Sequence, residues 1–157
     1  MSRNGKWIAT AGAGTVKLWN TTNAPAVPTT IDSVESIVVL EFSPDSKTLL
    51  IVSKDGAVRV QTLEGETDSV RFNAGRDVRH AAFNFNATRI VTARSDSTAR
   101  VWNALTGEPV TGPMKESTWL THSEFSPDGK WIVASAGGHR ASIWNAETGK
   151  KRSQLGG

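Results

Sequence analysis

Residues 125–149 read FSPDGKWIVASAGGHRASIWNAETG, and the rest of the chain repeats this stretch. It contains a turn, a short apolar run, a Gly-rich turn and a second run that ends at Trp144-Asn145. The same pattern stands at residues 83–107, FNFNATRIVTARSDSTARVWNALTG, and at residues 42–65, FSPDSKTLLIVSKDGAVRVQTLEG. Residues 4–20, NGKWIATAGAGTVKLWN, match the same unit with its first part missing.

The repeat has a nearly fixed length. Phe42, Phe83 and Phe125 are spaced 41 and 42 residues apart. Self-similarity at roughly 40–45 residues is typical of arrays in which each repeat forms one small sheet that cannot bury its faces alone. At 157 residues the chain has the length of about one domain. We therefore predict a single domain, residues 1–157, with repeat units at about 1–32, 33–73, 74–115 and 116–157.

Local sequence patterns predict an all-β fold. Short β-rich runs alternate with Gly-containing turns, and no segment has sustained helical periodicity. Residues 36–42 are almost continuously apolar, which indicates a strand covered on both faces. Residues 20–32 contain Pro25 and Pro28, so we expect a loop or an edge strand there. In the third unit we expect the outer strand near residues 108–111.

The turns FSPD at residues 42–45 and 125–128, together with Leu18-Trp19, Val101-Trp102 and Ile143-Trp144, resemble those of WD-repeat β-propellers. The resemblance covers nearly the whole chain. It implies about four blades of four strands each, named a to d from the inner strand outward. It also implies that the first blade lacks its inner strand, because only residues 1–3 precede its strand b.

Propellers of this family usually close with seven or eight blades, so an array of about four exposes apolar faces at both ends. Two interpretations stay open. The chain self-associates as a homodimer, so that two copies complete a ring of roughly eight blades, or it is a fragment of a larger propeller. Closed homo-oligomers are the common solution for complementary exposed faces, and we therefore expect the dimer.

The family often contains a buried hydrogen-bonded tetrad of His, Ser or Thr, Asp and Trp. In the third unit Thr92, Asp96 and Trp102 stand at matching positions, whereas Ala74 stands near the position of the His. The resemblance implies that these residues stabilise a blade and have no catalytic role.

The resemblance also implies a non-enzymatic scaffold that binds proteins on one rim, formed by the d–a loops and the b–c turns. Trp and Arg are frequent at the centres of protein interfaces, and Trp119 is the best candidate for an exposed anchor. The start of an inner strand is also a good place to bury a Trp, so packing in the core is the other interpretation of Trp119. The residues that map to this rim are Glu35, Lys54, Arg76, Arg94, Trp119 and His139.

Motifs for catalysis are missing from the sequence, and we expect no enzymatic activity and no cofactor. His80 and His122 occupy equivalent positions on inner strands, as do Glu41 and Glu124, and repetition of the strand pattern explains both pairs. A metal site would need three or four ligands, so we predict none. A hydrolase or lyase built on a propeller is the alternative from another functional class.

The composition argues against nucleic acids and membranes as partners. The net charge of +3 comes from scattered bases, which does not favour nucleic-acid binding. The chain has 0 cysteines and no apolar run of the ~20 residues that cross a membrane, so we expect a cytoplasmic protein that is not membrane-bound.

Overall fold

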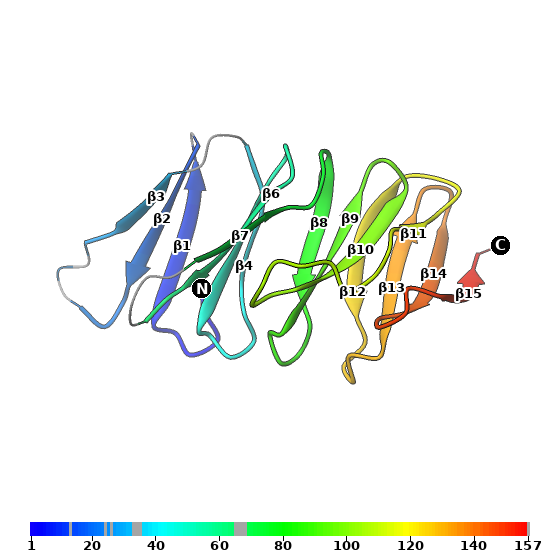
Figure 1. Ribbon diagram of the computed structural model, residues 1–157. Coiled ribbons are helices and arrows are strands. Elements are labelled where there is room, and N and C mark those ends of the chain that lie inside the picture. The colour runs from blue at the N-terminus through cyan, green and yellow to red at the C-terminus, as the bar shows by residue number, and fades with distance from the viewer. Residues whose placement is uncertain (13, 24, 26, 33–35, 65–68, 157) are drawn as a thin grey trace.

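The computed structural model describes residues 1–157 except 13, 24, 26, 33–35, 65–68 and 157. Its strands form four antiparallel sheets that stand side by side along the molecule (Figure 1). We call these sheets blades 1 to 4 in chain order. The predicted all-β, blade-like architecture is confirmed. The described residues include no helix that is long and apolar enough to cross a membrane.

Blade 1 has three strands and each of the other blades has four, paired in chain order. Blade 1 consists of β1 (Trp7–Gly12), β2 (Thr15–Asn20) and β3 (Thr29–Asp32). Blade 2 consists of β4 (Ile37–Phe42), β5 (Thr48–Ser53), β6 (Ala57–Thr62) and β7 (Ser69–Asn73). Blade 3 consists of β8 (Val78–Phe83), β9 (Arg89–Arg94), β10 (Thr98–Asn103) and β11 (Met114–Lys115). Blade 4 consists of β12 (Leu120–Phe125), β13 (Trp131–Ala136), β14 (Arg140–Asn145) and β15 (Lys151–Leu155).

The outer strand of blade 3 differs from the expectation. We expected it near residues 108–111, and residues 108–110 do lie beside β10: the Asn103 amide donates to the Glu108 carbonyl (2.8 Å), the Val110 amide donates to the Val101 carbonyl (2.8 Å), and a bridge joins Pro109 to Trp102. The strand β11, however, covers Met114–Lys115. Pro109 occupies a non-hydrogen-bonded position of the bridge, where its missing N–H is not needed, and Pro113, which cannot donate to a ladder, lies directly before β11.

The inner strands β4, β8 and β12 neighbour one another across successive blades. In Figure 1 the turns between strands b and c and the connections from strand d to the next blade lie at the upper edge. We call this edge the upper rim. Its described residues are 14, 36, 54–56, 74–77, 95–97, 116–119 and 137–139.

One turn recurs at the opposite edge, where strand a leads into strand b. In blade 4 the Ser126 hydroxyl donates to Asp128 Oδ1 and accepts a hydrogen bond from the Trp131 amide. The first residues of the chain form the same turn: the Ser2 hydroxyl donates to Asn4 Oδ1 (2.7 Å) and accepts from the Trp7 amide (3.0 Å). The sequence SRNGKW at residues 2–7 therefore corresponds to SPDGKW at 126–131.

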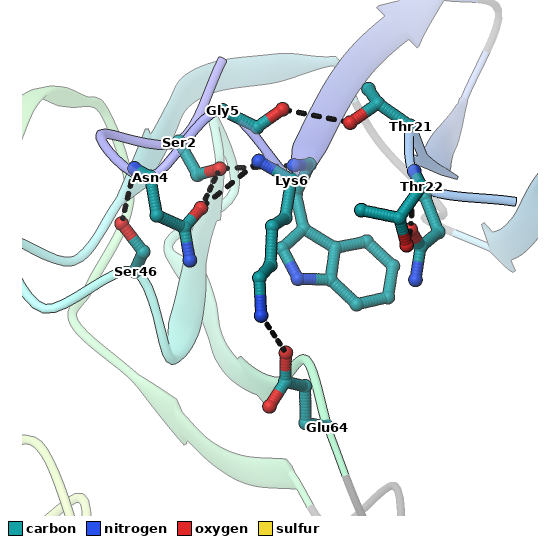
Figure 2. Close-up of polar contacts among 10 residues, drawn as sticks. Ser2, Asn4, Gly5, Lys6, Thr21, Thr22, Ser46 and Glu64 are labelled. Atoms are coloured by element: carbon teal, nitrogen blue, oxygen red, sulfur yellow. Dashed lines mark hydrogen bonds and ion pairs between the residues drawn. The ribbon is translucent and has the colours of Figure 1, made fainter.

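This first turn also attaches blade 1 to blade 2 (Figure 2). The Asn4 amide donates to Ser46 Oγ in the equivalent turn of blade 2, at 3.2 Å. Lys6 Nζ lies 3.9 Å from Glu64 Oε1, but both side chains are exposed, so this ion pair adds little stability. The backbone-to-hydroxyl bond is the more specific link between the two turns.

Each inner strand carries a β-bulge at its upper end. The register of β4 shifts between Ile37 and Val39, and β8 and β12 shift at the equivalent place. The extra residue is Val38 in β4, Arg79 in β8 and Thr121 in β12. A bulge changes the direction of the side chain that it inserts, and these bulges place Arg79 and Thr121 at the upper rim.

Apolar clusters fill the spaces between adjacent blades. Val16 and Leu18 of blade 1 are buried with Leu49 of blade 2. The other two interfaces use equivalent positions. Within strands b and c, successive side chains therefore point alternately to the preceding blade and to the following blade. The buried residues include Leu50, Val52, Ile90 and Trp102 between blades 2 and 3, and Val91, Val101, Ile132 and Trp144 between blades 3 and 4.

One face of blade 4, the face directed away from blade 3, is not covered by another blade in the part of the chain that the structure describes. We call it the outer face, and its residues are equivalent to residues that are buried between the other blades. Val133 occupies the position of Leu50 and Val91, because each of these residues lies in the middle of its strand b on the face toward the next blade. Val133 is 42% exposed, whereas Leu50 and Val91 are 0% exposed. On the same face the Arg152 guanidinium lies 4.3 Å from the centre of the Trp131 ring.

The opposite face of blade 1 is exposed in the same way. Ile8 pairs across the strands with Trp19, as Ile132 pairs with Trp144. Ile8 is 38% exposed, whereas Ile132 is fully buried. The two ends of the array therefore expose residue positions that are buried between blades elsewhere in the described structure.

Candidate functional site

The upper rim is held together by backbone hydrogen bonds between each b–c turn and the neighbouring d–a connection. The Asp77 amide donates to the Lys54 carbonyl (2.9 Å), and the Ser95 amide donates to the Asp77 carbonyl (3.0 Å). In blade 4 the Gly137 amide donates to the Trp119 carbonyl (3.0 Å). Side chains on this rim therefore project from a hydrogen-bonded base.

Trp119, the candidate anchor, is a large apolar side chain that is exposed on this rim. Its side chain is 55% exposed, and its indole lies against the backbone of Gly137. A Cβ atom at Gly137 would be 2.9 Å from Cε2 and 3.0 Å from Nε1 of the indole, closer than packed atoms approach. The missing side chain at Gly137 thus leaves the space that the indole occupies.

A hollow of about 620 Å³ lies beside Trp119. Its walls are Trp119 and Thr121 from blade 4 and Arg79 and Ser95 from blade 3. The Arg79 Nε–H donates to the Ser95 hydroxyl, and the Thr121 and Ser135 hydroxyls are 2.8 Å apart. The hollow therefore spans the junction of two blades, and the two bulge residues form part of its wall.

Arg94 and Arg76, both predicted for the rim, are joined by a contact within blade 3. Arg94 donates from Nε to the Arg76 carbonyl (3.0 Å), and its guanidinium forms a 2.9 Å ion pair with Asp96. The Arg94 side chain is only 25% exposed. This arginine fastens the rim, whereas the Arg76 side chain is exposed.

The remaining predicted rim residues lie apart from these contacts. Lys54 is exposed in the b–c turn of blade 2, and His139 is exposed in that of blade 4 with a positive φ of 60°. Glu35 lies outside the described residues. Sequence reasoning did not single out Arg79 for the rim, although Arg79 was visible as one of several arginines in the third unit.

Two of the three predicted tetrad residues are in contact. The Trp102 indole N–H donates to Thr92 Oγ1 at 3.0 Å, and both residues are buried. Asp96 instead accepts from the amide and hydroxyl of Thr98 and pairs with Arg94. The link between Thr92 and Asp96 would need the family's His, and Ala74 has no polar side chain to supply it.

The repeated histidines and glutamates on the inner strands do come together. The rings of His80 and His122 have centroids 3.7 Å apart, and His122 Nε2 lies 2.9 Å from Glu124 Oε1. Burial and the neighbouring His122 lower the pKa of His80. Burial raises the pKa of Glu41, and the charge of Glu124 adds to this shift.

These inner-strand groups do not assemble into a metal centre. Within the part of the chain that the structure describes, no group of three or more His, Cys, Asp or Glu side chains is placed to hold a metal ion. The shifted pKa values follow from burial and like charges, which also occur in the absence of catalysis.

Comparison with known proteins gives a family match over much of the chain. The search of curated proteins found no match to this chain. The family model described as WD domain, G-beta repeat matches residues 1–20, 57–103 and 111–145, which together are more than half of the chain. These segments contain Trp19, Trp102, Trp144 and the turn at residues 125–128, on which the resemblance rested, although the turn at residues 42–45 lies outside them. The chain therefore belongs to the WD40 repeat family.

Proposed function

We propose that this chain is a non-enzymatic scaffold for protein–protein interaction, located in the cytoplasm, that binds its partners on the upper rim around Trp119. WD40 repeat domains typically mediate protein interactions. The observation that carries the proposal is the exposed Trp119 indole, held over Gly137 beside a hollow of about 620 Å³. An exposed tryptophan on a rigid base loses little conformational entropy on binding, which favours its use as an anchor.

The test compares proteins captured by the purified chain and by two variants. Trp119→Ala should lose partners that Leu105→Ala retains, because Leu105, an apolar residue that is even more exposed (71% against 55%), lies in a turn between strands c and d, at the opposite edge. Capture that is the same with both variants would contradict binding through Trp119.

Gly137→Ala gives a second variant that leaves Trp119 in the sequence. Its Cβ would force the indole to move, so we expect the partner to be lost while the free energy of unfolding changes little. Gly112→Ala is the matched control, because a Cβ at Gly112 meets nothing within 4 Å.

A second part of the proposal concerns the two ends of the array. We infer that the outer face of blade 4 in one copy packs against the face of blade 1 in a second copy, so that two chains complete one ring. Support comes from Val133 and Ile8, which are exposed although their equivalents Val91 and Ile132 are buried. Contact between two different faces is heterologous, and it closes into a ring if the rotation between copies permits.

Light scattering across a dilution series tests this association. We expect a mass twice the 16.8 kDa of one chain, and a monomer for Val133→Asp and for Ile8→Asp. Phe85→Asp should remain dimeric, since Phe85 is exposed in the turn between β8 and β9, away from both end faces. A monomer at all concentrations would contradict self-association and favour the alternative, in which other blades of a larger propeller cover these faces.

A further inference from the structure

The hollow beside Trp119 combines an apolar wall with one cation. Its volume of about 620 Å³ is within the usual range of roughly 300–1,000 Å³ for binding pockets. The Trp119 ring supplies the apolar wall, and Arg79, the extra residue of the β8 bulge, supplies the charge.

The two arginines of blade 3 differ in how their charges are balanced. Arg94 is paired with Asp96 at 2.9 Å. Among the residues that the structure describes, no carboxylate lies within ion-pair distance of Arg79. The Arg79 Nε–H is directed to the Ser95 hydroxyl, so this neutral contact orients the guanidinium and leaves its terminal N–H groups for a ligand.

We propose that this hollow binds an acidic peptide segment of the partner, with an apolar or aromatic side chain against Trp119 and a neighbouring carboxylate on Arg79. The proposal rests on the proposed function and names the chemistry of the partner. Charge complementarity selects the acidic segment, because a guanidinium without a protein counter-charge forms strong, paired hydrogen bonds with a carboxylate. A basic segment would place like charges together at Arg79 and would be disfavoured.

The fixed geometry of the hollow supports a side-chain pocket. The Trp119 indole lies against Gly137, the Arg79 Nε–H is hydrogen-bonded to Ser95, and the Thr121 and Ser135 hydroxyls are hydrogen-bonded to each other. A partner side chain thus meets walls that are already positioned, and little ordering of this rim is needed on binding.

The experiment measures binding of three fluorescent heptapeptides to the full chain by anisotropy. The acidic probe has a central phenylalanine with glutamates on both sides. In the basic probe lysines replace the glutamates, and in the third probe alanine replaces the phenylalanine. We expect saturable binding of the acidic probe, at least about tenfold tighter than binding of either other probe, and weaker binding at high salt.

Three variants test which residues of the chain contact the probe. Arg79→Gln should weaken binding of the acidic probe by about tenfold and remove the preference over the basic probe. Trp119→Ala should weaken binding of both phenylalanine probes. Arg71→Gln, on the outer strand β7 of blade 2, is the matched control and should leave binding unchanged. Thermal melting of each variant confirms that it is folded.

Three results would overturn the inference: equal binding of the acidic and basic probes, an Arg79→Gln variant that binds like the unmodified chain, or no saturable binding of the acidic probe at about millimolar concentration. None of them affects the capture experiment with Trp119→Ala, which tests the proposed function by itself. A Trp119-dependent partner together with any of these results would mean that the rim binds proteins of another chemistry.

Discussion

The Trp102 indole N–H donates a 3.0 Å hydrogen bond to the Thr92 hydroxyl, and this bond joins the middle strands of blade 3 beneath a buried interface. The indole also lies against Phe72, with ring centroids 4.9 Å apart. Thr92 is fully buried, so water cannot replace the hydroxyl if it is removed.

Thr92→Val should therefore destabilise the chain by about 1–3 kcal/mol, because the shape is kept while the indole N–H loses its acceptor. The measurement is the free energy of unfolding in urea. In a double-mutant cycle with Trp102→Phe, the loss at Thr92 should become much smaller. Equal losses with and without the indole N–H would mean that the hydrogen bond is not the cause.

In blade 4 the missing hydrogen bond to the indole could be added by a substitution. Trp144 is equivalent to Trp102, but Ala134 stands at the position of Thr92, and the Trp144 indole N–H has no hydrogen-bond partner among the described residues. Ala134→Ser should supply an acceptor and stabilise the chain by about 0.5–1.5 kcal/mol. In a Trp144→Phe background the same serine should give no gain, and a gain there would contradict this explanation.

A third prediction concerns the a–b turns. Ala87 has a φ of 58° at the position where Gly129 has a φ of 70° in blade 4. Because a Cβ is disfavoured in this left-handed conformation, Ala87→Gly should stabilise the chain by about 0.5–1 kcal/mol despite the greater freedom of glycine in the unfolded state. Gly129→Ala should have the opposite effect. Thermal melting measures both, and a loss of stability with Ala87→Gly would contradict the prediction.

The same turns contain carboxylates with shifted pKa values. The hydrogen bond from the Ser126 hydroxyl, followed by one from the Lys130 amide, lowers the pKa of Asp128. Ser126→Ala should raise the pKa of Asp128 toward its ordinary value, as measured by NMR titration of the carboxyl carbon. A group whose pKa is lowered by folding stabilises the protein above its unfolded pKa of about 4, and this contribution is lost as the pH falls further. The variant should therefore lose less stability below about pH 4.

The lowered pKa of His80 predicts a second dependence of stability on pH. Burial first, and then the charge of His122, lower the pKa of His80, although the Ser123 carbonyl and Glu124 partly oppose them. The unfolded chain then binds the proton more readily, so stability should fall as the pH drops below about 6.5.

His80→Gln should reduce this loss of stability between about pH 7 and pH 5, as measured by denaturation at several pH values. His139→Asn, in an exposed turn with positive φ, is the control and should keep the pH dependence of the unmodified chain. An unchanged pH profile with His80→Gln would contradict the assignment to His80.

The sequence was sufficient for the blades because the repeat spacing and the alternation of apolar residues are local properties. The turn at residues 2–7 could also have been recognised, since SRNGKW has the same polar and glycine positions as SPDGKW at 126–131. The short outer strand β11 was harder to place, because Pro109 and Pro113 interrupt a segment with no clear alternation.

The residues of the proposed binding site could be selected from the sequence only in part. Trp119 could be placed on the rim from the repeat register, and its exposure agrees with a role as an anchor. Arg79 could not be selected, because its direction depends on a β-bulge that only the hydrogen-bond ladder defines. The ion pair between Arg94 and Asp96 likewise could not be predicted from the sequence, since it depends on side-chain positions across one turn.

The two end faces differ from one another, and this gives any assembly of the chain a direction. One end presents Ile8 and Trp19, and the other presents Val133 and Ile143. In the proposed ring of two copies, a molecule with a charge at Ile8 keeps an unchanged blade-4 face, so with one unmodified chain it can form one of the two contacts but not the second. The difference between the two faces therefore allows the loss of one contact to be separated from the loss of both.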